Sequence, residues 1–486
     1  MSTALENGPR RLPRPWRGGL IRSSRDELRW LGVFVLPAAV LLAWLITISL
    51  RAAIALVIVV LIAGVHQTNR RVGILALFTF WCVAPELRRV LGELLGFAGN
   101  DPLSVAPFVA TLILSALELR RRPLAPNVRR VLLLAAAGFL VGLPLGVLHA
   151  RSGLYALLAY MAGLAAAVLG ANEPRELTRG ALRRVLLVGA PLLALYAILT
   201  QRVLTLPPWQ QAWLDNVSFS SIGADTAGHV RIFSTLNAPG TLAPLLGAAL
   251  LAYITVRAPR GRARSMAIVG ALLIAVGLEL TFVRSSWLAL PVAALAHVLA
   301  TRGRSARLVF GVLAMIVLVT VALAPVSPTA RDVVNRAGTF GTLNNDVSAS
   351  ARTSTLSQSL PSAIRAPLGH GLGTAGQPSQ LNSSQADLAI PDNGYLALMY
   401  QVGPIGFLLV MAALLLTLKA AWDAARGPTQ TNETGALLFA VLVFMLIVLS
   451  SGDAFYGLGG LTLWFVGGHA LSLVEPAALR QPALRA

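Results

Sequence analysis

The chain has 486 residues and a formal net charge of +20, yet 56% of its residues are hydrophobic and only 12% are charged. A soluble domain carries about 25% charged residues, so this composition excludes an ordinary soluble protein, a disordered chain and a disulfide-rich secreted scaffold. It predicts a polytopic membrane protein whose arginine excess reflects topology and contact with anionic lipid, rather than nucleic-acid binding. Cys82 is the only cysteine, so no intramolecular disulfide can form.

The first segment, residues 1–29, is polar and rich in arginine, without a short apolar core before a small-residue cleavage site. We expect a cytoplasmic tail there and no signal peptide. Apolar runs that can cross a bilayer follow, and they predict an all-α bundle of about 12–14 spanning helices. The candidate spans are 30–50, 52–66, 72–87, 103–119, 131–149, 153–171, 184–201, 236–256, 266–283, 286–300, 307–325, 392–418, 436–451 and 457–474.

Placing the N-terminus in the cytoplasm sorts the basic residues by side, because nearly all of the net positive charge then falls in cytoplasmic segments. The positive-inside rule supports this alternation and a cytoplasmic tail at 475–486. N-terminal transmembrane helices are predicted over 30–201, and a second membrane region over 202–474. Two outer loops in the second region, 202–235 and 326–391, are too long for turns; we expect them to contain short helices and to carry function.

Basic residues on the predicted outer side are exceptions to this rule. They are Arg51, Arg88, Arg89, Arg151, Arg202, Arg231, Arg284, Arg331, Arg336, Arg352 and Arg365. An arginine there can bind phosphate oxyanions through its planar guanidinium, or it can simply extend to the membrane interface. Both interpretations stay open for a single one of these residues.

Two of these arginines stand apart by their position in the chain. Arg284 lies in a hairpin with almost no loop between two apolar spans. Its charge is therefore held near membrane depth, where it should face protein or water rather than lipid. Arg231 lies where the first long outer loop re-enters the membrane.

The second long outer loop re-enters the membrane at the run DNGY, residues 392–395. It also contains Arg352 and the run PLGHGLG at 367–373, which includes His370. This run lacks the Lys-Ser/Thr and the preceding strand of a phosphate loop. We therefore interpret its glycines as permitting a tight loop.

Metal and hydrolase motifs are not found. The six histidines are scattered without a HxxH or HxxxH pair, and no GxSxG occurs, so we expect no metal and no cofactor. Glu279 lies well inside a span, and an intramembrane acid is a functional candidate. It supports an alternative function, a transporter or flippase of a lipid-linked or amphipathic substrate, which leaves the long outer loops unexplained. A scaffold protein is a further alternative.

Four segments, in their order along the chain, resemble the bacterial O-antigen ligase and polymerase family. Residues 231–240 resemble the family's Arg-x-x-Gly-Thr-Phe followed by Pro-Asn, with Ser234 in place of the glycine and with Asn237 and Pro239 in altered order. Residues 281–290 resemble Thr-x-Ser-Arg-x-x-Trp-Leu, and Arg284 and Trp287 match that pattern.

The other two segments come from the second outer loop and the span after it. Residues 367–373 resemble the family's Pro-Leu-x-Gly-x-Gly-Leu-Gly. Residues 392–406 resemble His-Asn-x-Tyr-Leu followed by two spaced glycines, with Asp392 in place of the histidine. The resemblance extends over roughly residues 225–460.

The resemblance implies a metal-independent glycosyltransferase of the bacterial inner membrane, with an active site that faces outward. Such an enzyme takes a glycan from a polyprenyl diphosphate carrier and attaches it to a glycan, lipid-linked or protein acceptor. Arg231 and Arg284, with Arg352 as a weaker third, are then expected to stabilise the diphosphate leaving group. The expected substrate-binding residues are Arg352, Asn393, Tyr395, His370 and Trp287.

An acceptor hydroxyl needs a base within hydrogen-bonding reach. Ligases of the family have histidine at the position of Asp392. A carboxylate can serve as the base, and it fits a different acceptor or a polymerase-like member. In the alternative, Asp392 only caps its helix, and the base is then unidentified.

Overall fold

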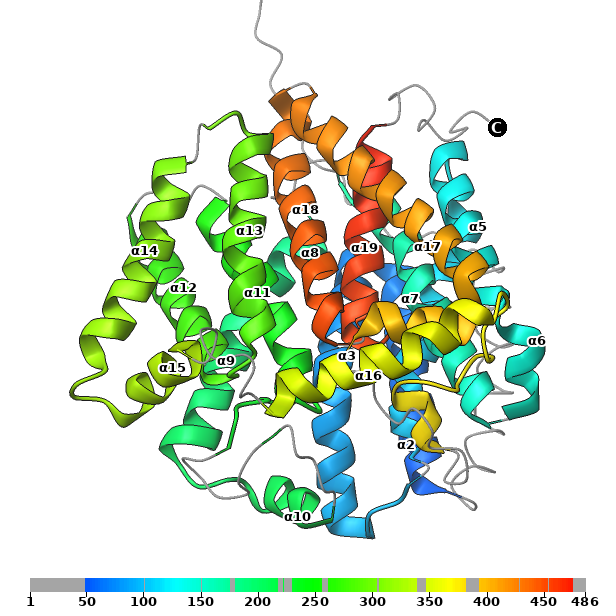
Figure 1. Ribbon diagram of the computed structural model, residues 1–486, viewed down its shortest axis with the longest axis horizontal. Coiled ribbons are helices and arrows are strands. Elements are labelled where there is room, and N and C mark those ends of the chain that lie inside the picture. Colours follow the sequence, from blue (N-terminus) through cyan, green and yellow to red (C-terminus); the bar gives the residue numbers. More distant parts are fainter. Residues whose placement is uncertain are drawn as a thin grey trace, which may run out of the picture. The chain divides into compact units, whose positions relative to one another are not determined.

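The computed structural model describes residues 49–99, 101–149, 151–174, 180–216, 222, 230–255, 261–303, 306–338, 347–381, 393–427, 429–452 and 454–474. The chain divides into two compact units, Met1–Ile54 and Ala55–Ala486, and the packing reported below is that of the second unit. The described residues are mostly helical, which confirms the predicted all-α class (Figure 1).

Helices, or runs of helical turns, cover every predicted span from 52–66 onward, while span 30–50 lies almost wholly outside the described residues. They are α2 (Leu50–Thr68), α3 (Arg70–Leu95), α4 (Ala106–Arg121), α5 (Pro126–Leu140) with α6 (Leu143–Gly146) and η2 (Val147–His149), α7 (Arg151–Ala171), α8 (Ala181–Arg184) with η4 (Val185–Gly189), α9 (Ala190–Ile198) and η5 (Leu199–Val203), α11 (Pro239–Thr255), α12 (Arg262–Leu280), α13 (Arg284–Ala300), α14 (Ala306–Leu323), α17 (Gly394–Arg426), α18 (Thr429–Val448) and α19 (Gly457–Leu473).

Among the described helices, five are long and apolar enough to cross a membrane, and the bent pair that starts at Pro126 would make a sixth. Three shorter apolar helices accompany them, Pro239–Thr255, Arg284–Ala300 and Val309–Leu323. The fold is consistent with a polytopic helical membrane protein. The count of about 12–14 spanning helices stays a prediction.

Both long connections contain helices, as predicted. The first carries α10 (Pro208–Asn216), and the second carries α15 (Pro328–Gly338), α16 (Val347–Arg365) and η7 (Gln377–Leu381). With 19 residues, α16 is longer than a short loop helix, and it packs against α17. In Figure 1, α10 lies beside the last turns of α3, which it contacts.

The centre of the bundle is built on small residues. α7 and α19 pack so closely that a Cβ atom on Gly170 would lie 1.9 Å from the Phe465 carbonyl oxygen. A Cβ atom on Gly468 would likewise lie 2.0 Å from the Ala167 carbonyl oxygen. Small residues let transmembrane backbones approach in this way, so these helices form a rigid base for their neighbours.

The start of α3 carries a buried ionic network. Glu118 of α4 accepts from Arg70 Nε at 2.9 Å and lies 3.0 Å from His66 Nε2. Arg70 also lies 3.7 Å from Glu173, which follows α7. Three connections that the sequence analysis places on one side of the membrane therefore meet at this end of α3.

Two predicted spans are broken, which the apolar pattern did not show. The helix that starts at Pro126 bends by 45° before Leu143. α17 is interrupted at Gly403, whose φ is 68°, just before Pro404. The glycine-rich loop meets both breaks, since Leu372 N donates to the Gly142 carbonyl at 3.0 Å and Gly371 N to the Gln401 carbonyl at 3.1 Å.

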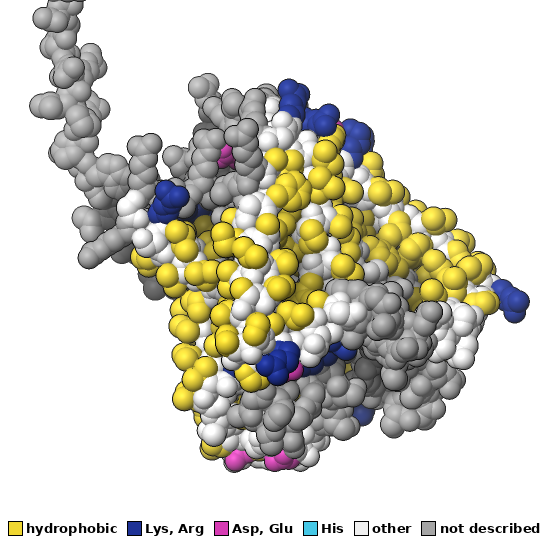
Figure 2. Space-filling view, turned by 60° about the vertical axis from the view of Figure 1, so that its left-hand side comes forward, with side chains coloured by type: hydrophobic (Ala, Val, Ile, Leu, Met, Phe, Trp, Pro, Cys, Tyr) yellow, Lys and Arg dark blue, Asp and Glu magenta, His cyan; other side chains and the backbone are white. Residues whose placement is uncertain are grey.

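Apolar side chains cover much of the surface. Met315, Val317 and Leu318 of α14 are each about 60% exposed. Figure 2 shows a broad band of hydrophobic side chains with groups of basic side chains above and below it. Apolar exposure on this scale marks a surface that contacts a membrane or another protein.

Candidate functional site

The turn between α12 and α13 brings two predicted site segments together. Arg231 donates from Nε to the Thr281 carbonyl at 3.0 Å and from an Nη nitrogen to the Phe282 carbonyl at 3.2 Å. Ile232 N donates to the Leu280 carbonyl at 3.2 Å. These bonds hold Arg231 against the residues at the end of α12. The last of the bonded residues, Phe282, precedes Arg284 by two positions.

Arg284 is the first residue of α13 and is buried. The N-cap residue, Val283, makes no side-chain hydrogen bond to the helix. An uncapped helix N-terminus carries partial positive charge and favours anions. Trp287 fixes the hairpin, because its indole Nε1 donates to the Leu278 carbonyl at 3.1 Å.

A third arginine lies at the same turn, and the sequence analysis did not select it. The guanidinium carbon of Arg202 lies 5.5 Å from the centre of the Phe282 ring. One sequence feature could have identified Arg202 as a site residue. It directly follows predicted span 184–201, at the start of the long loop that ends near Arg231.

The backbone of this region is unusual at two residues. Phe282 and Ser234 have φ of 54° and 58°, values that favour glycine. Ser234 occupies the position where the resembled family has glycine, so the left-handed backbone gives that preference a physical reason. The Ser234 hydroxyl donates to the Leu193 carbonyl at 2.8 Å, which offsets part of the strain.

A second group of predicted residues lies at the start of α17. Asn393 is the N-cap of this helix, and its side-chain oxygen accepts from Tyr395 N and Leu396 N, each at 3.1 Å. The capping role that the sequence left open for Asp392 is therefore filled by its neighbour. Asp392 lies outside the described residues, so its role as a base stays a prediction.

Tyr395 points into the helix bundle. Its hydroxyl donates to the Leu446 carbonyl at 2.5 Å, and its ring makes edge contacts with Phe407 and Phe455. These contacts join α17 to α18 and to the connection before α19. A direct part in substrate binding for Tyr395 stays a prediction.

His370 lies between α16 and α17 and contacts both. Its ring stacks on Tyr400, with 4.0 Å between ring centres, and Nε2 lies 3.2 Å from the Ser362 hydroxyl. Gly369 has φ of 74°, and a Cβ atom there would lie 2.3 Å from the Gln401 carbonyl oxygen. The glycines thus serve close backbone packing, in agreement with the interpretation as a tight loop.

The predicted residues therefore form two groups. Arg231, Arg284 and Trp287 surround one turn, while Asn393, Tyr395 and His370 follow the first half of α17. Arg352 is on α16, but its side chain is outside the described part of the structure. α13 and α17 contact one another.

Glu279 has a packing role. Its carboxylate accepts from the Thr320 hydroxyl at 2.6 Å, which ties α12 to α14. Within the described residues, no group of three histidine, cysteine or acidic side chains is placed to hold a metal ion.

Part of the chain matches the model of a known protein family. Residues 269–411 match the model of a family described as O-antigen ligase. The match runs from α12 into α17 and includes the Arg284 hairpin and the glycine-rich loop, whereas Arg231 precedes it. It supports an O-antigen ligase family assignment and, at family level, a membrane glycosyltransferase of the ligase or polymerase type. No curated protein matches the chain.

Proposed function

We propose that this multi-pass membrane protein transfers a glycan from a polyprenyl diphosphate carrier to a glycan, lipid-linked or protein acceptor at the outer face of the bacterial inner membrane. One observation carries the proposal. Arg231 and Arg284, selected from two separate sequence segments, meet at a single turn, where Arg231 bonds to the Thr281 and Phe282 carbonyls. The family match over residues 269–411 supports the class of reaction.

The chemistry follows from the charge of the leaving group. In the transfer, the bond between the sugar anomeric carbon and the diphosphate oxygen breaks, and a bond to the acceptor hydroxyl oxygen forms. The carrier diphosphate leaves with additional negative charge, and preorganised guanidinium groups stabilise that charge most when they need not move. Arg231, fixed by two carbonyl bonds, and Arg284, buried at the start of α13, suit this role without a metal ion.

Arg202 extends the cationic site. It approaches the Phe282 ring from the end of η5, so the guanidinium groups of Arg202 and Arg231 both contact the turn that ends at Arg284. Like charges gathered in this way repel one another, and a bound anion relieves the repulsion. In our proposal Arg202 contributes to diphosphate binding, with Arg352, Asn393 and His370 near the acceptor.

The acceptor hydroxyl must lose its proton as the new bond forms. We assign that proton to the carboxylate of Asp392. The residue directly precedes the N-cap of α17, so a rigid helix start fixes the chain beside it. Trp287 and Tyr395 then act as supports for the two halves of the site.

The test is reconstitution of the purified protein in vesicles with a polyprenyl diphosphate-linked oligosaccharide and an acceptor on the same face. A new covalent product supports the transferase. Movement of unmodified lipid-linked glycan across the bilayer, without product, supports a transporter or flippase instead. Orientation is checked in the same vesicles by protease access to the two tails, which we expect on the cytoplasmic side.

A further inference from the structure

A buried ion pair lies near the outer end of α3, and the sequence analysis gave it no role. Glu86 and Arg89 are one helical turn apart, and an Arg89 Nη donates to the Glu86 carboxylate at 2.6 Å. Glu86 is 8% exposed and Arg89 is fully buried. A buried pair of this kind is weak evidence for stability, since apolar residues of similar volume often pack as well. A role for the pair must therefore be argued from its contacts with other segments.

Glu86 gathers donors from two other helices. Its carboxylate accepts from the Tyr196 hydroxyl at 2.5 Å, from Trp209 Nε1 at 2.6 Å and from Gln210 Nε2 at 2.8 Å. Tyr196 belongs to α9, and the other two belong to α10. One carboxylate thus joins α3 to the helix before the first outer loop and to the helix inside it.

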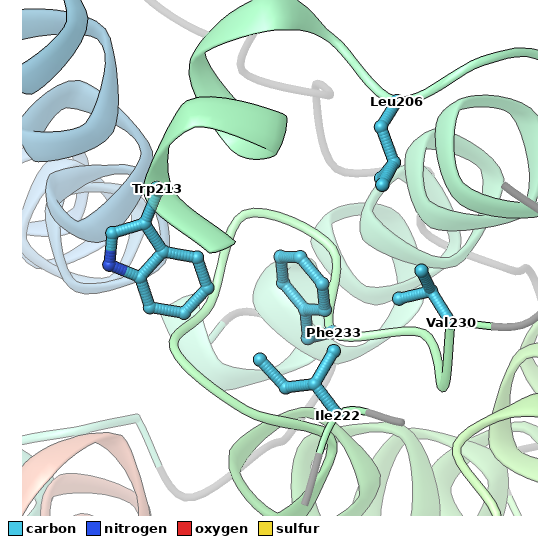
Figure 3. Packing of buried hydrophobic residues seen from close by; sticks show 5 residues of the cluster. All are labelled: Leu206, Trp213, Ile222, Val230 and Phe233. Atoms are coloured by element: carbon cyan, nitrogen blue, oxygen red, sulfur yellow. The ribbon is translucent and has the colours of Figure 1, made fainter. Parts of the chain in front are cut away.

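Arg89 reaches in the other direction, toward the segment that follows Arg231. Its second Nη donates to the Leu236 carbonyl. Its guanidinium carbon lies 4.2 Å from the centre of the Trp213 ring and 4.9 Å from that of Phe233. Figure 3 shows Trp213 and Phe233 turned toward one another within the small apolar cluster that they share with Ile222 and others.

Gln201 also binds the backbone of the segment that follows Arg231. Its side-chain oxygen accepts from Phe233 N at 2.9 Å and from Ser234 N at 3.0 Å. Its amide nitrogen donates to the Gln210 side chain at 2.8 Å and to the Ser234 carbonyl at 3.0 Å. Gln210 in turn bonds to Glu86, so a continuous buried network runs from the ion pair to the backbone beside Arg231.

We infer that Glu86 and Arg89 are positioning residues for Arg231. Arg89 binds the Leu236 carbonyl directly, and Glu86 is linked through Gln210 and Gln201 to the amide groups of residues 233 and 234. Together these bonds fix the backbone from which the Arg231 guanidinium meets an anion at the Thr281–Phe282 turn. The inference rests on the proposed function of Arg231. It assigns a task to the ion pair that an apolar pair could not perform, because only polar groups can bond to the Leu236 carbonyl and to α10 at once.

The experiment is a double-variant cycle on glycan transfer in vesicles, with Arg89→Lys, Arg231→Lys and both together. Lysine keeps the charge but cannot bond to Glu86 and Leu236 in the same planar geometry. A small displacement of a binding group costs about tenfold to a hundredfold in rate, and we expect that loss in kcat/KM for the donor. If Arg89 acts through Arg231, the double variant loses no more than Arg231→Lys alone.

Arg70→Lys is the matched control. It disturbs a comparable ion pair, Arg70 with Glu118, at the opposite end of α3. We expect its loss, whatever its size, to multiply with that of Arg231→Lys, because the sites are independent. Tyr196→Phe gives a milder test, since it removes one hydrogen bond to Glu86 and keeps the ring; its effect should also vanish when Arg231→Lys is present.

Two outcomes overturn the inference: wild-type donor kcat/KM in both Arg89→Lys and Tyr196→Phe, or losses that multiply with that of Arg231→Lys. If Arg89→Lys does not fold, Tyr196→Phe decides alone. Failure of the proposed function is a separate result, because Arg231→Lys itself would then transfer glycan at the wild-type rate.

Discussion

The guanidinium of Arg231 donates to the Phe282 carbonyl oxygen at 3.2 Å, across 51 positions of the chain. This bond ties the segment before α11 to the turn that opens α13, two residues from Arg284. Because the bond partner is a backbone atom, side-chain substitutions at Phe282 leave the acceptor in place. The relationship gives the proposed cationic site a fixed geometry before any substrate arrives.

Arg202 should contribute to donor binding. We expect Arg202→Gln to raise the donor KM by about tenfold, the size of one lost charge-assisted hydrogen bond, with a smaller change for Arg202→Lys. The measurement is steady-state glycan transfer at varied donor concentration. Arg151→Gln, which removes an exposed arginine at the start of α7, is the control and should leave KM unchanged. A wild-type KM in Arg202→Gln would remove Arg202 from the site.

Ser234 should distinguish backbone strain from hydrogen bonding. Glycine relieves the cost of a φ of 58° but loses the bond to Leu193, so Ser234→Gly should be close to neutral in unfolding free energy. Ser234→Ala keeps the strain and loses the bond, and it should destabilise the protein by about 1 kcal/mol. Thermal unfolding in detergent checks the order. An alanine variant as stable as the glycine variant contradicts the assignment of strain.

The glycine-rich loop should be intolerant of a side chain. Gly369→Ala places a Cβ atom 2.3 Å from the Gln401 carbonyl oxygen at a φ of 74°, and we expect a loss of at least about 2 kcal/mol in stability. Gly311→Ala is the matched control on α14. Apart from its chain neighbours and the nearby backbone of its own helix, no described atom lies within 4 Å of its Cβ position. Helix propensity should therefore make the variant neutral or slightly stabilising. Equal unfolding temperatures for the two variants would argue against the close packing of this loop.

Asp392 should be needed for chemistry rather than for folding. Because Asn393 already caps α17, Asp392→Asn and Asp392→Ala should both insert and melt normally yet lose most of the transfer rate. A base must be deprotonated to accept the hydroxyl proton, so the wild-type transfer rate should fall when the solution is acidified. Full rates for both variants across the pH range would leave the base elsewhere.

The fold class and the helix positions could be predicted because apolar runs must be helical in a bilayer, where backbone groups have no water to bond. α2, α7 and α19 follow their predicted spans closely. The break at Gly403 could not be predicted, because it depends on the loop at 367–373 packing against α17. The apolar pattern contains no information on that distant contact.

The candidate site was predicted in part, for a similar reason. Arg231 and Arg284 were selected because each is a charge held at a membrane boundary, and the structure brings them to one turn. Arg202 and the pair of Glu86 and Arg89 were missed as site residues because their significance comes from partners far away in sequence, such as Phe282 and Leu236. A carboxylate three residues before an arginine, at the edge of span 72–87, was the one local sign of the pair.

The most direct measurement is the rate of glycan transfer by purified wild-type, Arg231→Lys and Arg284→Lys proteins in vesicles with a polyprenyl diphosphate-linked donor. Lysine keeps each positive charge but not the planar fork that binds a diphosphate. We predict that each variant inserts and melts like the wild type and loses transfer by at least about a hundredfold. Wild-type transfer rates in both variants would contradict the proposal that these arginines hold the leaving group.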